Sequence, residues 1–280
     1  MKIGFVTDLH FRHTVPGTSR NVRRECRLAG EALDHVLEAL AGEAVDVVVC
    51  AGDCVDDATQ PGALGDLAIL AERFAASGLR CIILPGNHDP APDVFYSIVP
   101  RPPRVLRLGD CELISFGDDA YAPGEQRCAR SPESLTLMTN LLAANPPDVA
   151  LTFLVQHFLA YPAHTGPGYN HTYANDGVLR AIMERSPRRL AVLSGHQHRG
   201  HEITIHNGVT YFTGRALCER PFPYYILHAD GGSFRVEERA AESLSESLHR
   251  MDVALPPDGA GTPVAALTAP AMSAPSGTGN

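Results

Sequence analysis

The chain has 280 residues, of which 44% are hydrophobic and 13 are histidine, and its 23 basic and 32 acidic residues leave a formal net charge of −9. A chain of this length can bury a large core without disulfides or a structural metal, and its seven cysteines without a CxxC pair indicate reduced thiols. No apolar run approaches the roughly 18 residues of a membrane helix, and the acidic balance disfavours a general nucleic-acid coat, so we expect a cytoplasmic protein with no membrane partner.

The first part of the chain predicts alternating strands and helices. Strands are expected at residues 2–6, 46–50 and 80–84, and helices at residues 19–40 and 63–76. The first helix is predicted from an apolar stripe at helical spacing that begins at Val22 and ends at Leu40. Its arginines lie off that stripe, where a solvated helix face is preferred over a nucleic-acid contact.

The rest of the chain continues the alternation and then changes to strands alone. Strands are expected at 112–116, 149–155 and 190–193, with helices at 132–144 and 176–185. A strand meander is expected after them, at 201–205, 209–213, 224–228 and 233–237. This order predicts an α/β fold with a partly mixed sheet.

Each of five apolar strands is followed directly by Asp, Asn or His. The side chains concerned are Asp8, His10, Asp53, Asn87, His157, His196 and His198. Because sites in open α/β sheets form outside the carboxyl ends of the strands, we expect the five loops to converge.

These residue types select a metal centre. Imidazole, carboxylate and amide oxygen suit Mn, Fe or Zn. Seven ligands are too many for one tetrahedral ion and indicate two divalent or mixed-valence ions about 3.5–4 Å apart, with Asp53 as the candidate bridge. Such a centre keeps a local positive charge, which suits a small phosphate-ester substrate.

The ordered set D-x-H, GD-x-x-D, GNHD, a lone His and GH-x-H resembles the signature of the calcineurin-like metallophosphoesterases, from Met1 to about Arg239. The resemblance implies an α/β fold, a four-layer α-β-β-α sandwich of two mixed sheets. It implies one ion held by Asp8, His10, Asp53 and His198, and a second held by Asp53, Asn87, His157 and His196.

The same resemblance implies an enzyme that hydrolyses phosphate esters by attack of a metal-bound hydroxide. His88 would aid the leaving group, and Asp56 would orient His88. We expect the metallophosphoesterase domain at residues 1–240 and a C-terminal extension at 241–254. The Pro-, Gly- and Ala-rich residues 255–280 predict a disordered tail.

Departures from the family pattern narrow the expected subfamily. Asp57 and Ala58 stand where protein serine/threonine phosphatases carry Arg-Gly, and the metal-bound Tyr of purple acid phosphatases has no evident match. The pattern is closer to cyclic-nucleotide phosphodiesterases and to SbcD/Mre11-type DNA exonucleases. The short chain after GH-x-H favours a phosphodiesterase acting on a smaller ester. A DNA exonuclease is the alternative, followed by a non-catalytic metal-binding scaffold.

Substrate contacts are expected from two loops beside the metal ligands. The loop at 160–175 follows His157 and carries His164, Tyr169 and His171, while His13 follows the first motif. The alternative is an ordinary surface loop and an incidental histidine.

Overall fold

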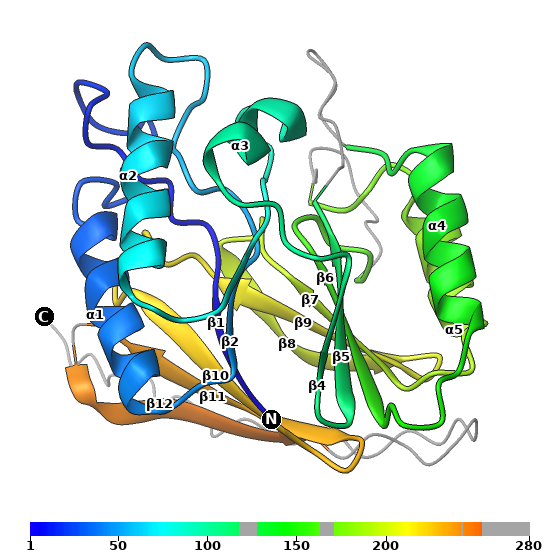
Figure 1. Cartoon of the computed structure of the whole chain (residues 1–280). Helices are drawn as coiled ribbons and strands as arrows, with labels where there is room; N and C mark the ends of the chain where they lie inside the picture. The colour runs from blue at the N-terminus through cyan, green and yellow to red at the C-terminus, as the bar shows by residue number, and fades with distance from the viewer. Residues whose placement is uncertain (118–127, 163–170, 242, 254–280) are drawn as a thin grey trace, which may run out of the picture.

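The computed structural model describes residues 1–117, 128–162, 171–241 and 243–253, and for the last of these ranges the description covers the backbone. Two six-stranded sheets pack face to face, with helices on their outer faces (Figure 1). The predicted four-layer α/β sandwich of two mixed sheets is confirmed.

The elements have the following bounds. The first sheet contains β1 (Lys2–Val6), β2 (Val47–Cys50), β3 (Cys81–Ile83), β10 (Pro223–Asp230), β11 (Ser233–Ala240) and β12 (Ser243–Val253). The second contains β4 (Val105–Leu108), β5 (Cys111–Phe116), β6 (Leu151–Gln156), β7 (Leu190–Ser194), β8 (Arg199–His206) and β9 (Val209–Arg215). The helices are α1 (Ala29–Gly42), α2 (Ala63–Ala76), α3 (Pro92–Ile98), α4 (Pro132–Ala143) and α5 (Asp176–Glu184).

Both sheets are parallel in the part that carries the predicted site. The first has the order β12-β11-β10-β1-β2-β3, with β1, β2 and β3 parallel and β10 antiparallel to β1. The second has the order β4-β5-β6-β7-β9-β8, with β5, β6, β7 and β9 parallel. The carboxyl ends of the parallel strands therefore lie at one edge of each sheet.

Alternate residues of the strands fill different hydrophobic cores. Ile3 and Phe5 of β1 belong to the core between the two sheets, whereas Val6 belongs to the core beneath α1, α2 and α3. A third core lies between the second sheet and helices α4 and α5. Period-two burial of this kind is what two apolar faces require of a central strand. Gly4 lies against α1, where an added Cβ would come within 2.9 Å of Leu40 Cδ2.

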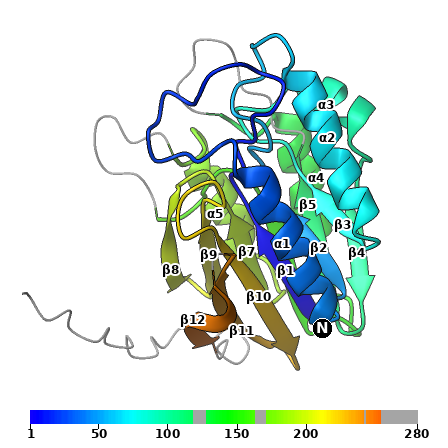
Figure 2. The same ribbon diagram turned by 90° about the vertical axis from the view of Figure 1, so that its left-hand side faces the viewer.

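The predicted first helix is too long. Helix α1 begins at Ala29, and residues 19–28 form turns and irregular backbone. Val22, the start of the predicted apolar stripe, is 95% exposed. The amide of Glu25 donates instead to the carbonyl of Cys218 at 2.7 Å, so a contact distant in sequence replaces a helical hydrogen bond. The connection from β1 to α1 lies at the top of the molecule, in dark blue, in Figure 2.

The predicted strand meander is also divided between the sheets. β8 and β9 form a hairpin in the second sheet, while in the first sheet β10 pairs with β1 and β11 pairs with β10. The elements α3, β4 and β12 were not predicted. β12 falls within the predicted C-terminal extension and adds an edge strand to the first sheet. The division at residue 240 stays a prediction, and the predicted tail at 255–280 lies outside the described residues.

In the described part of the chain, each helix is too short or too polar to cross a bilayer. The seven cysteines are free.

Candidate metal centre

The carboxyl ends of β1, β2, β3, β6 and β7 meet at one edge of the two sheets (Figure 1). β1, β2 and β3 are parallel, as are β6 and β7, so the loops of each sheet leave it on the same side. They bring together all the side chains of the predicted cluster, namely Asp8, His10, Asp53, Asn87, His157, His196 and His198.

The backbone at the site adopts a conformation that side chains rarely tolerate. Asp8, His10, Asp53 and His196 have φ values of 55°, 44°, 54° and 68°. A non-glycine residue in this region costs of order 1–3 kcal/mol, and such residues concentrate at functional sites. The first two loops hold each other in place, because Asp8 N donates to the carbonyl of Gly52 at 3.0 Å and His10 N to that of Asp53 at 2.9 Å.

Asp53 lies at the centre of the cluster and faces two groups of ligands. Its Oδ2 is 3.4 Å from His10 Nε2, and its Oδ1 is 3.4 Å from His157 Nε2. The ligand atoms of Asp8, His10 and Asp53 lie within 4.8 Å of one another, as do those of Asp53, His157 and His196. One buried carboxylate thus belongs to both groups, as a bridging ligand must.

When His157 is neutral, as a metal ligand must be, lone pairs face one another around it. Its Nδ1 donates to the carbonyl of Ala51 at 2.7 Å, so the Nε2 of the neutral ring carries a lone pair. That atom is 3.2 Å from Asn87 Oδ1 and 3.4 Å from Asp53 Oδ1, and both oxygens are acceptors. Three acceptors aimed at a common point fit a cation.

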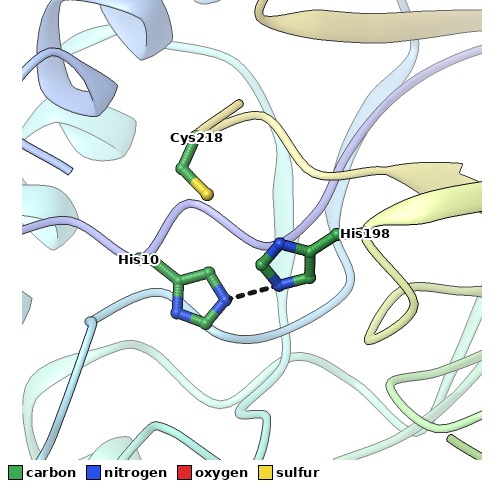
Figure 3. A group of neighbouring side chains, drawn as sticks. All are labelled: His10, His198 and Cys218. Atoms are coloured by element: carbon green, nitrogen blue, oxygen red, sulfur yellow. Dashed lines mark hydrogen bonds between the residues drawn. The ribbon is translucent and has the colours of Figure 1, made fainter. Parts of the chain in front are cut away.

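The other group is centred on His10 and His198, whose Nε2 atoms are 3.0 Å apart (Figure 3). His198 Nε2 is also 3.7 Å from Asp8 Oδ1. The buried thiol of Cys218 points toward this pair, and its sulfur lies within 4.8 Å of a ring nitrogen of each histidine. Cys218 was missed from the sequence because it follows none of the five motifs.

The electrostatics of the buried cluster also favour a cation. Burial would raise the pKa of Asp53, but the neighbouring imidazoles, above all His157, hold it well below its usual range. Burial would lower the pKa of His157, but the Asp53 carboxylate outweighs it and raises this pKa to about 9. For His10 burial prevails, and its pKa is well below the ordinary value. The site therefore attracts positive charge next to His157 and keeps His10 neutral, as a metal ligand must be.

His88 adjoins the cluster and is held at two points. Its backbone N–H donates to Asp53 Oδ1 at 2.9 Å, and its Nδ1 donates to the main-chain carbonyl of Asp56 at 2.5 Å. Its ring meets that of His10 edge-on, with centroids 4.6 Å apart. The contact with the Asp56 carbonyl places the proton of the neutral ring on Nδ1.

The predicted role of Asp56 needs a correction, since its carbonyl and not its carboxylate holds His88. The carboxylate is occupied by four donors: Nε and Nη2 of Arg12, Nη1 of Arg24 and the hydroxyl of Ser19, at 2.8–3.2 Å. Charge-assisted hydrogen bonds from two guanidinium groups are stronger than one from a neutral imidazole.

These contacts also change the interpretation of the arginines in residues 19–28. Arg24 is largely buried against Asp56 rather than solvated. Arg27 donates to the carbonyls of His13, Val15 and Gly17, and so fixes the β1–α1 connection. Nothing in the local pattern distinguishes these arginines from surface ones.

The residues predicted to contact the substrate lie in different places. The side chain of His171 lies beside the cluster, with its ring centroid 5.2 Å from that of His196. His13 is exposed, and its ring stacks on the ring of Phe11. His164 and Tyr169 lie outside the described residues.

One carboxylate near the cluster was missed altogether. Glu219 Oε1 accepts a hydrogen bond from His198 Nδ1 at 2.7 Å. It lies between β9 and β10, in a loop without a recognisable motif.

Comparison with known proteins agrees with this geometry. Residues 1–200 match the family model described as calcineurin-like phosphoesterase. The chain is similar to the 3′,5′-cyclic adenosine monophosphate phosphodiesterase CpdA of Vibrio vulnificus, with 24% identity over 78% of this chain and 77% of the relative. It is 25% identical to the Escherichia coli K12 protein of the same name, over 81% of this chain and 84% of the relative.

Two solved structures show the same fold. A dimetal phosphatase from Danio rerio superposes with a TM-score of 0.70 at 13% identity, over 90% of this chain and 98% of that one. Purple acid phosphatase PPD1 from yellow lupin superposes with a TM-score of 0.61 at 11% identity, over 89% of this chain and 53% of that one.

Proposed function

This chain belongs to the calcineurin-like phosphoesterase family, and on that premise we propose that it hydrolyses small phosphodiesters of the cyclic-nucleotide class at a two-metal centre. As a member of the family it is a metallophosphoesterase, a metal-dependent hydrolase. The diester preference is supported by the two relatives of the cyclic-AMP phosphodiesterase class. The observation that carries the two-metal centre is the position of Asp53 between two groups of acceptors.

The donor set fits two divalent ions. The proposed ligands of one are Asp8, His10, Asp53 and His198, and those of the other are Asp53, Asn87, His157 and His196. When bound, such ions supply Lewis-acid charge and lower the pKa of a coordinated water. Nitrogen and oxygen donors of this kind accept Mn, Fe or Zn, so the choice of metal stays open.

The chain's own residues would position the leaving group. His88 is tied to Asp53 through its backbone N–H, so its ring is placed relative to the bridging carboxylate. Because the Asp56 carbonyl fixes the proton on Nδ1, Nε2 is the nitrogen that would hold or deliver a proton at the leaving oxygen. His171, beside His196, is the described side chain proposed to contact the rest of the substrate.

The DNA exonuclease alternative receives less support. The β1–α1 connection is rich in arginine, but Arg12 and Arg24 are engaged by Asp56 and Arg27 by main-chain carbonyls. Arg20, Arg23 and Arg27 are exposed, and Arg23 lies 3.8 Å from Glu219. Three exposed cations in this connection are few for binding a nucleic-acid backbone, which needs many phosphate contacts. The non-catalytic scaffold receives even less support, because the chain has every proposed metal ligand. The cytoplasmic location stays a prediction.

The test is an activity screen of the reconstituted protein. Metal-free protein would be loaded with Mn²⁺, Fe²⁺ or Zn²⁺ and assayed on a cyclic nucleotide, an aryl phosphodiester, an aryl phosphomonoester and single-stranded DNA. We expect cleavage of the two small diesters. We expect His88→Ala to lower turnover at least about 100-fold without loss of bound metal.

The matched control is His35→Ala, which removes an exposed histidine on α1 and should leave turnover unchanged. Protein that binds two ions and cleaves none of the four substrates with any of the metals would refute the proposal. Cleavage of DNA alone would favour the exonuclease.

A further inference from the structure

The loop between β9 and β10 forms an additional wall of the metal centre. Ala216 N donates to the carbonyl of His198 at 3.0 Å, and Cys218 N donates to that of Asp8 at 3.2 Å. Leu217 N donates to the carbonyl of Thr7 at 2.9 Å. The loop is thus bound to the segments that follow β1 and β7, and this places its next residue, Glu219, behind His198.

Glu219 and His198 form a short, directed contact. Glu219 Oε1 accepts from His198 Nδ1 at 2.7 Å, and the two side chains are 16% and 11% exposed. A carboxylate can only accept, so the proton of the neutral ring is on Nδ1 and the lone pair is on Nε2. Nε2 is the atom that faces His10 Nε2 at 3.0 Å (Figure 3).

We propose that Glu219 is a positioning residue that fixes the tautomer and orientation of His198 for metal binding. The inference rests on the proposed two-metal centre. A carboxylate on the far nitrogen of a ligating histidine orients the ring and makes the ligating nitrogen more basic. Glu219 touches neither the substrate nor the proposed ion, and it acts through His198.

His157 and His10 lack an equivalent carboxylate bond. His157 Nδ1 donates to the neutral carbonyl of Ala51, and His10 Nδ1 has no hydrogen-bond partner among the described residues. Glu219 contacts His198, which is a proposed ligand of one ion and not of the other. Its loss should weaken the ion at His198 and spare the ion at His157.

The second carboxylate oxygen of Glu219 is held only weakly, by Arg23. Arg23 Nε is 3.8 Å from Glu219 Oε2, and the Arg23 side chain is 53% exposed. An exposed pair at this distance contributes little. The position of Glu219 is thus set by the loop's backbone hydrogen bonds, and a substitution of its side chain should leave the loop in place.

The experiment compares Glu219→Gln, which keeps an acceptor but removes the charge, with Glu219→Ala, which removes both. Glu184→Gln is the matched control. Glu184 Oε1 also faces a histidine, at 3.8 Å from His206 Nε2, but this pair lies away from the metal centre. Metal affinity is measured by chelator competition with Mn²⁺ and Zn²⁺. The tautomer is measured by ¹⁵N NMR of histidine-labelled, metal-free protein, with the His198 signals assigned from His198→Gln.

We expect wild type and Glu219→Gln to keep the Nδ1–H tautomer of His198, and Glu219→Ala to lose it. One of the two ions should bind about 10-fold more weakly in Glu219→Gln and up to about 100-fold more weakly in Glu219→Ala. The other ion and the control should be unchanged. If Glu219→Ala does not fold, the near-isosteric Glu219→Gln decides by its metal affinity.

Wild-type affinity for both ions in the Glu219 variants, or an unchanged tautomer in Glu219→Ala, would overturn the inference and leave the proposed function intact. Failure of the wild-type protein to bind two ions would instead refute the proposed metal centre itself. The two failures are therefore distinguishable.

Discussion

A methyl group at position 86 should remove one of the two proposed ions. Gly86 precedes Asn87 in the loop after β3, and a Cβ added there would lie 2.7 Å from His157 Nε2 and 2.5 Å from Asp53 N. It would lie closer still to Asp53 Oδ1. Gly86→Ala therefore introduces a carbon where the lone pairs of two proposed ligands converge.

The size of the effect follows from these distances. Ordinary van der Waals contact begins at 3.4 Å, so His157 Nε2 would have to retreat by 3.4 − 2.7 = 0.7 Å, and Asp53 by more. Metal–ligand distances tolerate only about 0.2 Å, so the ion between these ligands should be lost. A displacement of this order costs about 100-fold in kcat/KM, or about 2.7 kcal/mol. Overpacking should lower the free energy of unfolding by about 1–3 kcal/mol.

The assay is metal content after dialysis, together with kcat/KM on an aryl phosphodiester. Gly86→Ala should retain one ion per chain where wild type retains two. The matched control is Gly42→Ala at the end of α1, where an added Cβ meets no atom within 4 Å. Two ions bound with wild-type affinity by a folded Gly86→Ala protein would refute the placement of the second ion.

Two further predictions follow from the charges at the site. Because the pKa of His157 is about 9 without metal, metal binding near pH 7.5 should release its proton, so affinity should rise with pH up to about 9 and level off above. Calorimetry in buffers of different ionisation enthalpy measures this release, and a pH-independent affinity would contradict it. Asp56→Asn keeps the carbonyl that holds His88, so kcat should stay within about tenfold of wild type, although Arg12 and Arg24 lose their partner and unfolding becomes easier by about 3–5 kcal/mol. Urea denaturation and kinetics test this together, and a kcat as low as that of His88→Ala would mean that the carboxylate is needed.

The convergence of the ligands within each sheet could be predicted because it depends on strand direction. Apolar runs such as 46–50 identify buried strands, and the polar residues after them must lie at their carboxyl ends. Parallel pairing of β2 and β3 then brings Asp53 and Asn87 together, and His157 meets them from β6 of the other sheet. The four-layer architecture came from the resemblance to a family, because periodicity does not say how strands divide between sheets.

The support around the site could not be predicted, because it depends on contacts between distant residues. Arg24 reaches Asp56 across 32 positions, and Glu219 reaches His198 across 21. The apolar spacing after residue 19 is helical, yet Val22 is exposed and Glu25 bonds to the β9–β10 loop. Arg12 is the exception: it follows His10 by two residues, and its closeness to the first motif was a usable signal.

The most direct test of the two-metal centre is anomalous X-ray scattering from crystals grown with Mn²⁺. We expect two anomalous peaks about 3.5–4 Å apart, one beside each oxygen of Asp53, with the nearer ligands His10 and His198 on one side and His157 on the other. A single peak, or a pair of peaks that does not flank Asp53, would contradict it.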